Sequence, residues 1–485
     1  MRRISLALGL LAAGCTVGPD YVKPPAPSPA AFKELDGWKP VQPADLTDRG
    51  AWWSVFNDPV LDELERQVEV SNQTLLADAA AYDEAVAVVA EARSQLFPTL
   101  SASPTASRNQ ENSNSFSGTS GSGSGRRVTT NSFAAEATVS WAPDLWGRVR
   151  RTIKGDVAAA QASAADLADA KLLAQATLAI DYFELRSADQ LKVLLNDTVS
   201  EYRRNLQITQ NQYSAGTAAR SDVITAQTAL QGAIAAQINV GVTRGQLEHA
   251  IAVLTGRAPS EVTIEPGKLP TSVPVVPAGL PSELLERRPD IAAAERTAAE
   301  ESEQIGIAIA AYYPTLTLTP SFGFSNSMLS KLFNASSQVW SLGASASETV
   351  FSGGERPAAI SAARSAYDGS VATYRQTVLS AFQQVEDELV ALHVYQQQLD
   401  AEVEAVRLAR QAVDVTLNQY RAGTQTYTAV ITAENTLLSD QQTELTVRQN
   451  LVVASVTLIE AIGGGFNATD LPKEDTMQKA HPVFP

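Results

Sequence analysis

Hydrophobic side chains recur in alternating steps of four and three residues over residues 378–420 of the chain. An apolar period of 3.5 residues predicts helices that pack as a coiled coil. Extended over residues 356–421, such a helix is about 100 Å long at 1.5 Å per residue. The first half of the chain shows the same spacing in a weaker form, at Leu173, Ala176, Ile180, Phe183 and Leu194.

Both long helices are expected to end at a glycine. Gly216 and Gly423 interrupt the helical pattern, and helix is expected to resume at Asp222 and Ala429. Each half of the chain therefore holds a predicted helical hairpin whose turn lies at one extreme end. Such a turn is either a plain loop or a docking site at the end of a long rod, and the residues leave both interpretations open.

Short stretches of the first half reappear in the second half in the same order. Residues 211–217 and 418–424 share the pattern Asn-Gln-Tyr-x-Ala-Gly-Thr, and Val-Ile-Thr-Ala follows in both halves at the same offset of about 207 residues. This self-similarity predicts an internal two-fold repeat, with a first unit at 51–255 and a second at 286–466.

Between the helices the period changes to two. Apolar and hydroxylated side chains alternate at about 96–107, 131–142, 313–325 and 338–349, which predicts four strands with two different faces. The segments 108–127 and 326–337 are expected to be exposed loops between paired strands. Such strands are typical of outer-membrane barrels, with lipid on one face and water on the other. A soluble sheet half-buried against the helices is the alternative.

Four strands are too few to close a barrel, since bacterial single-chain barrels have at least about eight. An open sheet in lipid leaves backbone groups without hydrogen-bond partners. If the strands span a membrane, several chains must therefore share one barrel. The predicted fold class is a mainly α-helical chain with membrane β-strands.

The N-terminus indicates the compartment. Residues 1–14 have two arginines followed by an apolar stretch of about ten residues, which is typical of a signal peptide. Cys15 follows three small residues and is the single cysteine of the chain. It is the predicted lipidation site, carrying diacylglycerol and an N-acyl chain; an ordinary signal peptide with a chance cysteine is the alternative. Residues 15–50 are expected to form a tether.

Composition narrows the chemistry. The 485 residues carry a net charge of −16, which argues against a nucleic-acid partner. One cysteine and three histidines leave no basis for a disulfide framework or a metal site. No cofactor is expected beyond the covalent lipid. The chain shows no nucleophile–base pair and no phosphate-binding loop, so an enzyme is not expected.

Several segments resemble the outer-membrane factor (TolC-like) family, and within it the OprM- and NodT-type lipoproteins. The segments lie in the family's order and cover nearly the whole chain from Cys15 to Phe466. They are Cys15-Thr16-Val17-Gly18-Pro19-Asp20-Tyr21, Trp52-Trp53 with Asp58-Pro59, Leu284-Leu285-Glu286-Arg287-Arg288-Pro289-Asp290-Ile291, Tyr313-Pro314, and Gly463-Gly464-Gly465-Phe466.

The resemblance implies a homotrimer in the bacterial outer membrane, with a twelve-stranded barrel continued by a helical tunnel through the periplasm. It implies an equatorial connector at 256–285 and a C-terminal tail at 467–485. Such channels are the passive exit duct of tripartite, RND-type efflux systems. Their partners are a periplasmic adaptor and an inner-membrane transporter.

The resemblance also places a gate near the hairpin turns. Asp222, Tyr213, Tyr420 and Arg421 are the gate candidates, although Asp222 also suits the first turn of a helix, where an acidic side chain is stabilising. The adaptor is expected to dock at the turns, on Gly216, Thr217, Gly423 and Thr424. A lipid-anchored periplasmic scaffold or adhesin without a pore is the alternative function; it accounts for the coiled coil but leaves the four strands unexplained.

Overall fold

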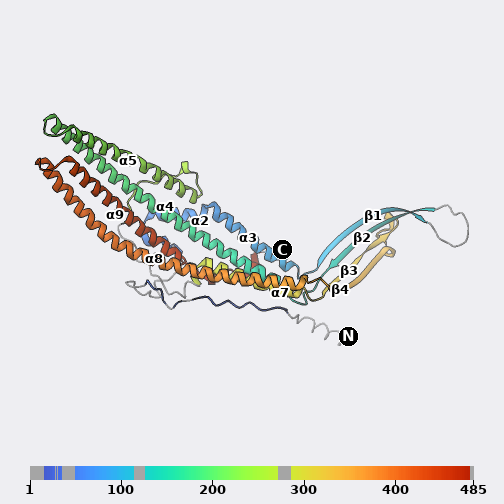
Figure 1. Ribbon diagram of the computed structural model, residues 1–485. Coiled ribbons are helices and arrows are strands. Elements are labelled where there is room, and N and C mark those ends of the chain that lie inside the picture. Colours follow the sequence, from blue (N-terminus) through green and yellow to red (C-terminus); the bar gives the residue numbers. More distant parts are fainter. Residues whose placement is uncertain are drawn as a thin grey trace.

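The molecule is long and narrow, with helices along most of its length and one sheet at one end (Figure 1). This computed structural model describes residues 16–27, 29, 31–34, 50–113, 126–270 and 286–480. The predicted signal peptide at 1–14 and Cys15 lie outside the described residues. So do residues 35–49 of the tether, residues 271–285 of the connector and residues 481–485 of the tail.

The two halves of the chain hold helices of equal length in the same order. Those of the first half have 22, 67 and 35 residues and are α3 (Gln73–Ser94), α4 (Arg148–Ser214) and α5 (Arg220–Leu254). Those of the second half also have 22, 67 and 35 residues and are α7 (Pro289–Ala310), α8 (Glu355–Arg421) and α9 (Tyr427–Ala461). The hairpin helices of the second half begin 207 residues after their counterparts, which is the offset of the sequence repeat.

Shorter elements complete the described chain. The 3-10 helix η2 (Trp52–Phe56) and α2 (Pro59–Ser71) precede α3. The 3-10 helices η3 (Pro259–Glu261), η4 (Leu329–Lys331), η5 (Ala335–Ser337) and η6 (Ala468–Asp470) lie in the connections, and α10 (Glu474–Ala480) follows last. Asp58 caps α2 by accepting from the backbone N–H of Val60 at 2.9 Å.

Each 67-residue helix begins directly after a glycine in the left-handed conformation. The φ angles of Gly147 and Gly354 are 81° and 92°. Residues other than glycine rarely adopt this backbone conformation. The two glycines therefore turn the chain from strand into helix at equivalent places in the two repeats.

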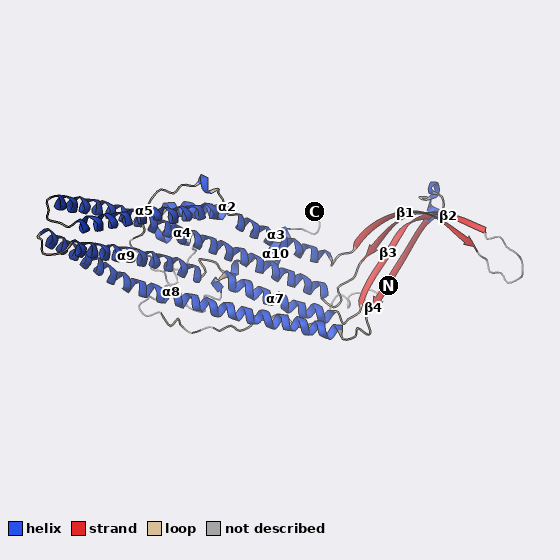
Figure 2. Ribbon diagram, turned by 45° about the horizontal axis from the view of Figure 1, so that its top comes forward, coloured by secondary structure: helices blue, strands red, loops and turns tan. Residues whose placement is uncertain are grey.

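The four strands form one antiparallel sheet in the order β1-β2-β3-β4. The strands are β1 (Thr99–Ser113), β2 (Arg126–Ser140), β3 (Thr315–Asn326) and β4 (Gln338–Ser347). The pairing of β2 with β3 joins the two repeats into a single sheet. Figure 2 shows this sheet bending away from the helices.

The strand bounds differ from those that the alternation predicted. β1 begins at Thr99 instead of about residue 96, because the backbone N–H groups of residues 95–97 still bond to carbonyls at the end of α3. The segment 108–127 is wrong as a loop over part of its length: residues 108–113 pair with 126–131 of β2. The alternation in the sequence ends at about residue 107, so it did not predict this pairing; residues 114–125 lie outside the described residues.

The helices pack side by side along the long axis (Figure 2). α7 lies between α4 and α8, α3 packs on α4, and each hairpin closes through α4 with α5 and α8 with α9. The largest apolar core lies midway along the molecule. It includes Tyr182 and Phe183 of α4 and Tyr374 of α8, with Trp52 and Trp53 of η2 packed against them.

The predicted coiled-coil stripe of α8 is buried over only part of its length. Val378, Val385 and Leu389 are fully buried within the single chain. Nearer the turn, Val403 has 48% of its surface exposed. The 3.5-residue period therefore continues beyond the surface that one chain can cover.

Candidate functional site

The sheet has one apolar face and one hydroxylated face. Directly paired residues of antiparallel strands point to the same side. One face carries the pairs Leu316–Ala346, Leu318–Ala344, Pro320–Leu342 and Phe322–Trp340. The opposite face carries Thr315–Ser347, Thr317–Ser345 and Ser321–Ser341. The register therefore separates the two kinds of side chain as the alternation predicted.

Strands β1 and β2 extend the same division. Their apolar face carries Leu100–Val139, Ala102–Ala137, Pro104–Ala135 and Ala106–Phe133, and their polar face Thr99–Ser140, Ser101–Thr138 and Ser103–Glu136. The pairing of Ala137 with Phe322 and of Thr138 with Ser321 makes each face continuous across all four strands.

Large apolar side chains project from the apolar face. Trp340 and Leu342 of β4 have 75% and 78% of their surface exposed. The ring of Phe324 packs edge-on against Phe322 and Phe333, at 5.9 and 5.5 Å between centroids. An exposed apolar band with aromatic residues near its ends suits contact with lipid.

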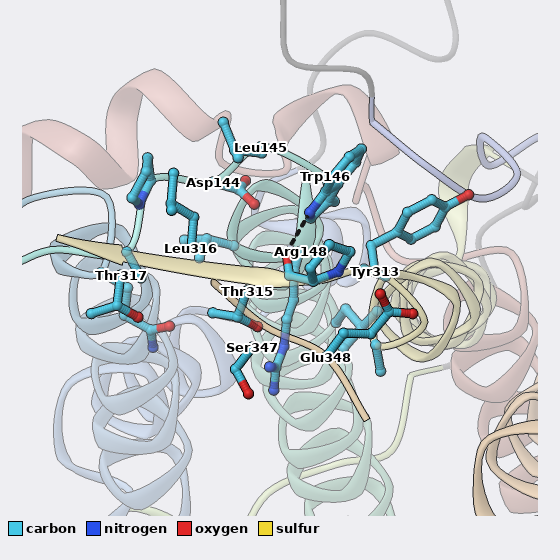
Figure 3. Close-up of a pocket in the computed structure, with 18 of the residues that line it drawn as sticks. Asp144, Leu145, Trp146, Arg148, Tyr313, Thr315, Leu316, Thr317, Ser347 and Glu348 are labelled. Carbon is cyan, nitrogen blue, oxygen red and sulfur yellow. Dashed lines mark hydrogen bonds between the residues drawn. The ribbon is translucent and has the colours of Figure 1, made fainter. Parts of the chain in front are cut away.

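A cavity of about 750 Å³ lies where the sheet meets the helices (Figure 3). Thr315, Thr317 and Ser347 of the hydroxylated face line it, together with Arg148 at the start of α4. The indole N–H of Trp146 donates to the carbonyl of Pro314 at 2.8 Å, and its ring stacks on Tyr313 at 4.8 Å. The junction is thus fixed by aromatic contacts, and both polar and apolar side chains line its cavity.

The two hairpin turns have the same geometry. Gly216 and Gly423 both have a φ of 76°. The N–H of Thr217 donates to Gln212 at 2.9 Å, and that of Thr424 to Gln419 at 3.0 Å. No described atom outside each glycine's immediate surroundings lies within 4 Å of the place where its Cβ would stand. Both turns are therefore open surfaces at the far end of the molecule (Figure 1).

The gate candidates divide between the two hairpins. Asp222 accepts a hydrogen bond from the N–H of Ala219 at 3.4 Å, so it stabilises the start of α5. Tyr420 is 9% exposed, and its ring packs on Tyr427 at 5.3 Å. Tyr213 is 47% exposed. Within the described chain, the Arg421 side chain makes no hydrogen bond or ion pair, and the four candidates do not form one network.

A buried polar cluster joins α4 and α9 near the turns, and the sequence did not predict it. The amide Nδ2 of Asn205 on α4 donates to Oε1 of Glu434 on α9. The hydroxyl of Tyr202 donates to Oδ1 of Asn435 at 3.0 Å. Tyr427, Val430 and Glu434 lie three and four residues apart on one helix face, and this spacing is the signal that could have located the acid.

Burial makes Glu434 a weak acid. Desolvation raises the pKa of its carboxyl to about 7; the nearby Glu201 carboxylate adds to the rise, and the bond from Asn205 opposes it. Its Oε2 has no hydrogen-bond partner within the described chain. The contact between the two hairpins therefore contains a group that changes charge near neutral pH.

Among the residues that the structure describes, none of the helices is both long enough and apolar enough to cross a bilayer. The chain combines a four-stranded sheet, with one apolar and one hydroxylated face, and two long helical hairpins. This combination is the organisation of outer-membrane channels. The chain belongs to the outer membrane efflux protein family, whose model matches residues 64–257 and 280–464.

Relatives match over almost their whole length. The probable efflux pump outer membrane protein TtgC of Pseudomonas putida is 29% identical over 468 residues, covering 96% of this chain and 95% of that protein. Nodulation protein T of Rhizobium leguminosarum bv. trifolii is 28% identical over 466 residues, covering 94% and 96%.

Solved structures show the same fold. The outer-membrane channel OprN superimposes with a TM-score of 0.86 at 28% identity, covering 93% of this chain and 99% of that one. The CmeC outer membrane channel of Campylobacter jejuni superimposes with a TM-score of 0.87, covering 97% of this chain and 99% of that one. At 20% identity this likeness supports the fold alone. The protein is an outer-membrane efflux channel component, and these comparisons disfavour a scaffold or adhesin without a pore.

Proposed function

We propose that three copies of the chain form one passive channel, which carries small molecules from an inner-membrane transporter across the periplasm and the outer membrane. The observation that carries this proposal is the two-faced sheet with its two outer edges open. β1 and β4 are the edge strands, and no described strand pairs with their outer sides. In lipid each unpaired backbone group costs several kcal/mol, so other copies must close the sheet.

The barrel must be wide enough for small molecules to pass through it, and this requirement sets the number of copies. Two copies reach the minimum of about eight strands, but side chains fill the interior of a barrel of that size. Three copies give twelve strands, with the hydroxylated faces lining a wet interior. The same assembly covers the exposed part of the coiled-coil stripe at Val403, because helices of neighbouring chains then pack along the tunnel.

The hairpin turns would form the periplasmic entrance. Gly216, Thr217, Gly423 and Thr424 lie at the exposed end and are the proposed docking surface for a periplasmic adaptor. Asp222, Tyr213, Tyr420 and Arg421 lie beside the turns, and in a trimer each becomes a ring of three. A ring of acidic side chains binds cations and repels anions at a narrow entrance.

Cys15 is the proposed site of lipidation, with diacylglycerol on its sulfur and an acyl chain on its amino group. Several acyl chains give firm anchoring where one is marginal. Relatives are named for efflux of antibiotics and of toluene, and these names support small organic molecules as the proposed cargo. The proposed partners are an adaptor and an RND-type transporter.

Cysteine cross-linking tests the shared barrel. The lipidated chain has no free thiol, so pairs of introduced cysteines report only on their own neighbours. Cysteines on the outer edges of β1 and β4 are expected to give a ladder of linked chains that ends at three. The control pair, Thr138→Cys with Ser321→Cys, is directly paired within the sheet and should link only within one chain. Monomers, or a ladder ending at two, contradict the trimer.

A conductance measurement tests whether the oligomer forms a channel. Purified protein added to a planar bilayer is expected to give discrete current steps from an oligomer that dissociates only on heating in detergent. An intact oligomer without current contradicts the channel.

A further inference from the structure

A buried arginine binds the segment that follows the predicted lipidation site. Arg151, on the first turns of α4, has no exposed surface. Its Nε donates to the carbonyl of Val17 at 2.5 Å and its Nη2 to the carbonyl of Gly18 at 2.9 Å. Its Nη1 donates to Oε2 of Glu303 on α7 at 2.8 Å. Two of these three hydrogen bonds therefore go to the N-terminal segment and one to a helix.

The segment fits closely into the groove between α4 and α7. Gly18 has a φ of 95°, and a Cβ there would lie 2.7 Å from the Cα of Gly306. A Cβ on Gly306 would itself lie 2.0 Å from Cδ of Arg151. The two glycines thus allow the backbone of the segment, the backbone of α7 and the arginine side chain to approach one another.

Docking places the start of the segment at the junction of the sheet and the helices. The N–H of Val17 donates to the carbonyl of Trp146 at 3.1 Å, in the connection from β2 to α4. Thr16 lies against Gly147, where a Cβ would be 2.7 Å from its methyl group. Trp146 and Tyr313 stack at the same level, and aromatic side chains of this kind favour the membrane–water interface.

The second repeat has no such site, although its helices have the same lengths. The counterpart of Arg151 in α8 is Ala358, and the counterparts of Glu303 and Gly306 in α3 are Ala87 and Ala90. A protomer has one N-terminus and one such arginine–glutamate pair within the described helices. The equivalent helices α8 and α3 do not pack on each other within the described chain, so the arginine–glutamate pair belongs to the α4–α7 contact alone.

The charge balance also depends on the docked segment. A buried guanidinium that loses its acceptors is strongly unfavourable. If the segment leaves this position, Nε and Nη2 of Arg151 lose both backbone acceptors and the ion pair of Nη2 with Asp20 (3.5 Å), and Glu303 remains as the buried partner. The body of the protein is thus completed by its own N-terminal segment.

We propose that Arg151 and Glu303 form a docking site for the segment that follows Cys15, and that docking joins the acyl anchor to the periplasmic end of the sheet. The anchor and the sheet then enter the membrane as one unit. This inference rests on the proposed lipidation of Cys15. It assigns to Arg151 a positioning role that is distinct from conduction.

Gly18→Ala tests docking without changing either helix. The added methyl group meets backbone atoms and the left-handed φ disfavours it, so the segment should leave the groove. Gly50→Ala is the matched control, because its Cβ would meet nothing within 4 Å. In the purified full-length protein, hydrogen exchange of the Val17 amide is expected to become about tenfold faster in Gly18→Ala and to stay unchanged in Gly50→Ala. Unchanged exchange in Gly18→Ala overturns the docking site.

Arg151→Lys provides a second variant that keeps the charge opposite Glu303. An ammonium at the end of a flexible stem cannot reproduce the planar fork that serves two carbonyls and a carboxylate. Val17 exchange is therefore expected to rise in this variant too, while the helical circular dichroism stays as in the wild type. Wild-type protection in Arg151→Lys overturns the role of the guanidinium.

A double-mutant cycle tests the coupling to the anchor. Cys15→Ser, carried on a signal peptide that is cleaved without lipidation, and Gly18→Ala should each reduce the amount of heat-dissociable oligomer recovered in the outer membrane. If docking transmits the anchor, the double variant shows no further loss beyond the larger single effect. Two losses that multiply overturn the coupling. The mass of the wild-type N-terminal peptide checks lipidation separately, and a peptide without acyl chains contradicts the proposed anchor while leaving the exchange result and the channel unaffected.

Discussion

The two hairpins of the chain are joined in different ways at their two ends. The hairpin root, residues 172–185 of α4 and 374–392 of α8, belongs to one large apolar core. The hairpin tip, residues 199–233 and 417–435, holds two small apolar clusters and the bonds Asn205–Glu434 and Tyr202–Asn435. The same helices thus pass from an apolar to a polar interface along their length.

This difference indicates which end is built to change. Apolar contact is non-directional and does not itself depend on pH, so the large apolar core of the hairpin root holds the two repeats together. Buried polar contacts depend on geometry and on protonation, and they are costly when partly satisfied. The hairpin tip has much smaller apolar clusters than the root, so less apolar contact is lost when its two hairpins separate. This suits an entrance that opens.

Truncation of matched leucines should separate the two ends most strongly. Leu389→Ala in the hairpin root removes a fully buried side chain and is expected to cost about 3 kcal/mol of unfolding free energy. Leu417→Ala in the hairpin tip, on the same helix, removes a half-buried side chain and should cost about 1 kcal/mol. Urea unfolding followed by helical circular dichroism measures both. Equal losses would remove the distinction between root and tip.

The pH dependence of the hairpin tip sharpens the comparison. Burial raises the pKa of Glu434 from its ordinary value of 4.5 to about 7 in the folded protein. Its neutral form is favoured by folding, so the stabilisation is complete below pH 4.5 and is lost as pH rises through 7. The expected loss is at most about 3 kcal/mol, at 1.36 kcal/mol per unit.

Hydrogen exchange of residues around 205 and 434, measured from pH 5 to pH 8 and corrected for intrinsic rates, tests this dependence. Glu434→Gln should abolish it and keep the tip as protected as the wild type is at pH 5. Burial also raises the pKa of two carboxyls in the hairpin root, Glu388 to about 7 and Asp181 to about 6, so any pH dependence there should be the same in both proteins. A pH dependence that persists in Glu434→Gln assigns the effect to another group.

Opening of the entrance is expected when charged groups beside the turns are removed. Asp222→Ala together with Arg421→Ala should raise single-channel conductance by about twofold or more, because charged rings at a narrow entrance control passage. Asp414→Ala together with Arg410→Ala is the control. It also removes one acidic and one basic residue, from exposed positions of α8 that lie farther from the turn. An intact oligomer with unchanged conductance rejects these two residues as gate groups.

The sequence predicted the parts of this fold that repeat. The period of 3.5 located α8, the glycines located both turns, and the period of two located the faces of the sheet. The sequence did not reveal the partners of Arg151 and Glu434, because both side chains bond to residues more than a hundred positions away. For Glu434, the spacing to Tyr427 and Val430 marks the helix face but not the partner. The pairing of residues 108–113 was missed because the alternation of apolar and hydroxylated side chains ends at about residue 107.

The smallest expected effect concerns the two turns, where the repeats are most alike. Gly216→Ala and Gly423→Ala each force a side chain into the left-handed conformation, at a cost of about 1 kcal/mol. The amides of Thr217 and Thr424 should then exchange about fivefold faster, and equally, because their hydrogen bonds match within 0.1 Å (2.9 and 3.0 Å). Unequal changes in the assembled channel show that something covers one turn. An adaptor that docks on both turns should slow exchange at both amides when it is added, and slowing at only one would confine docking to a single hairpin.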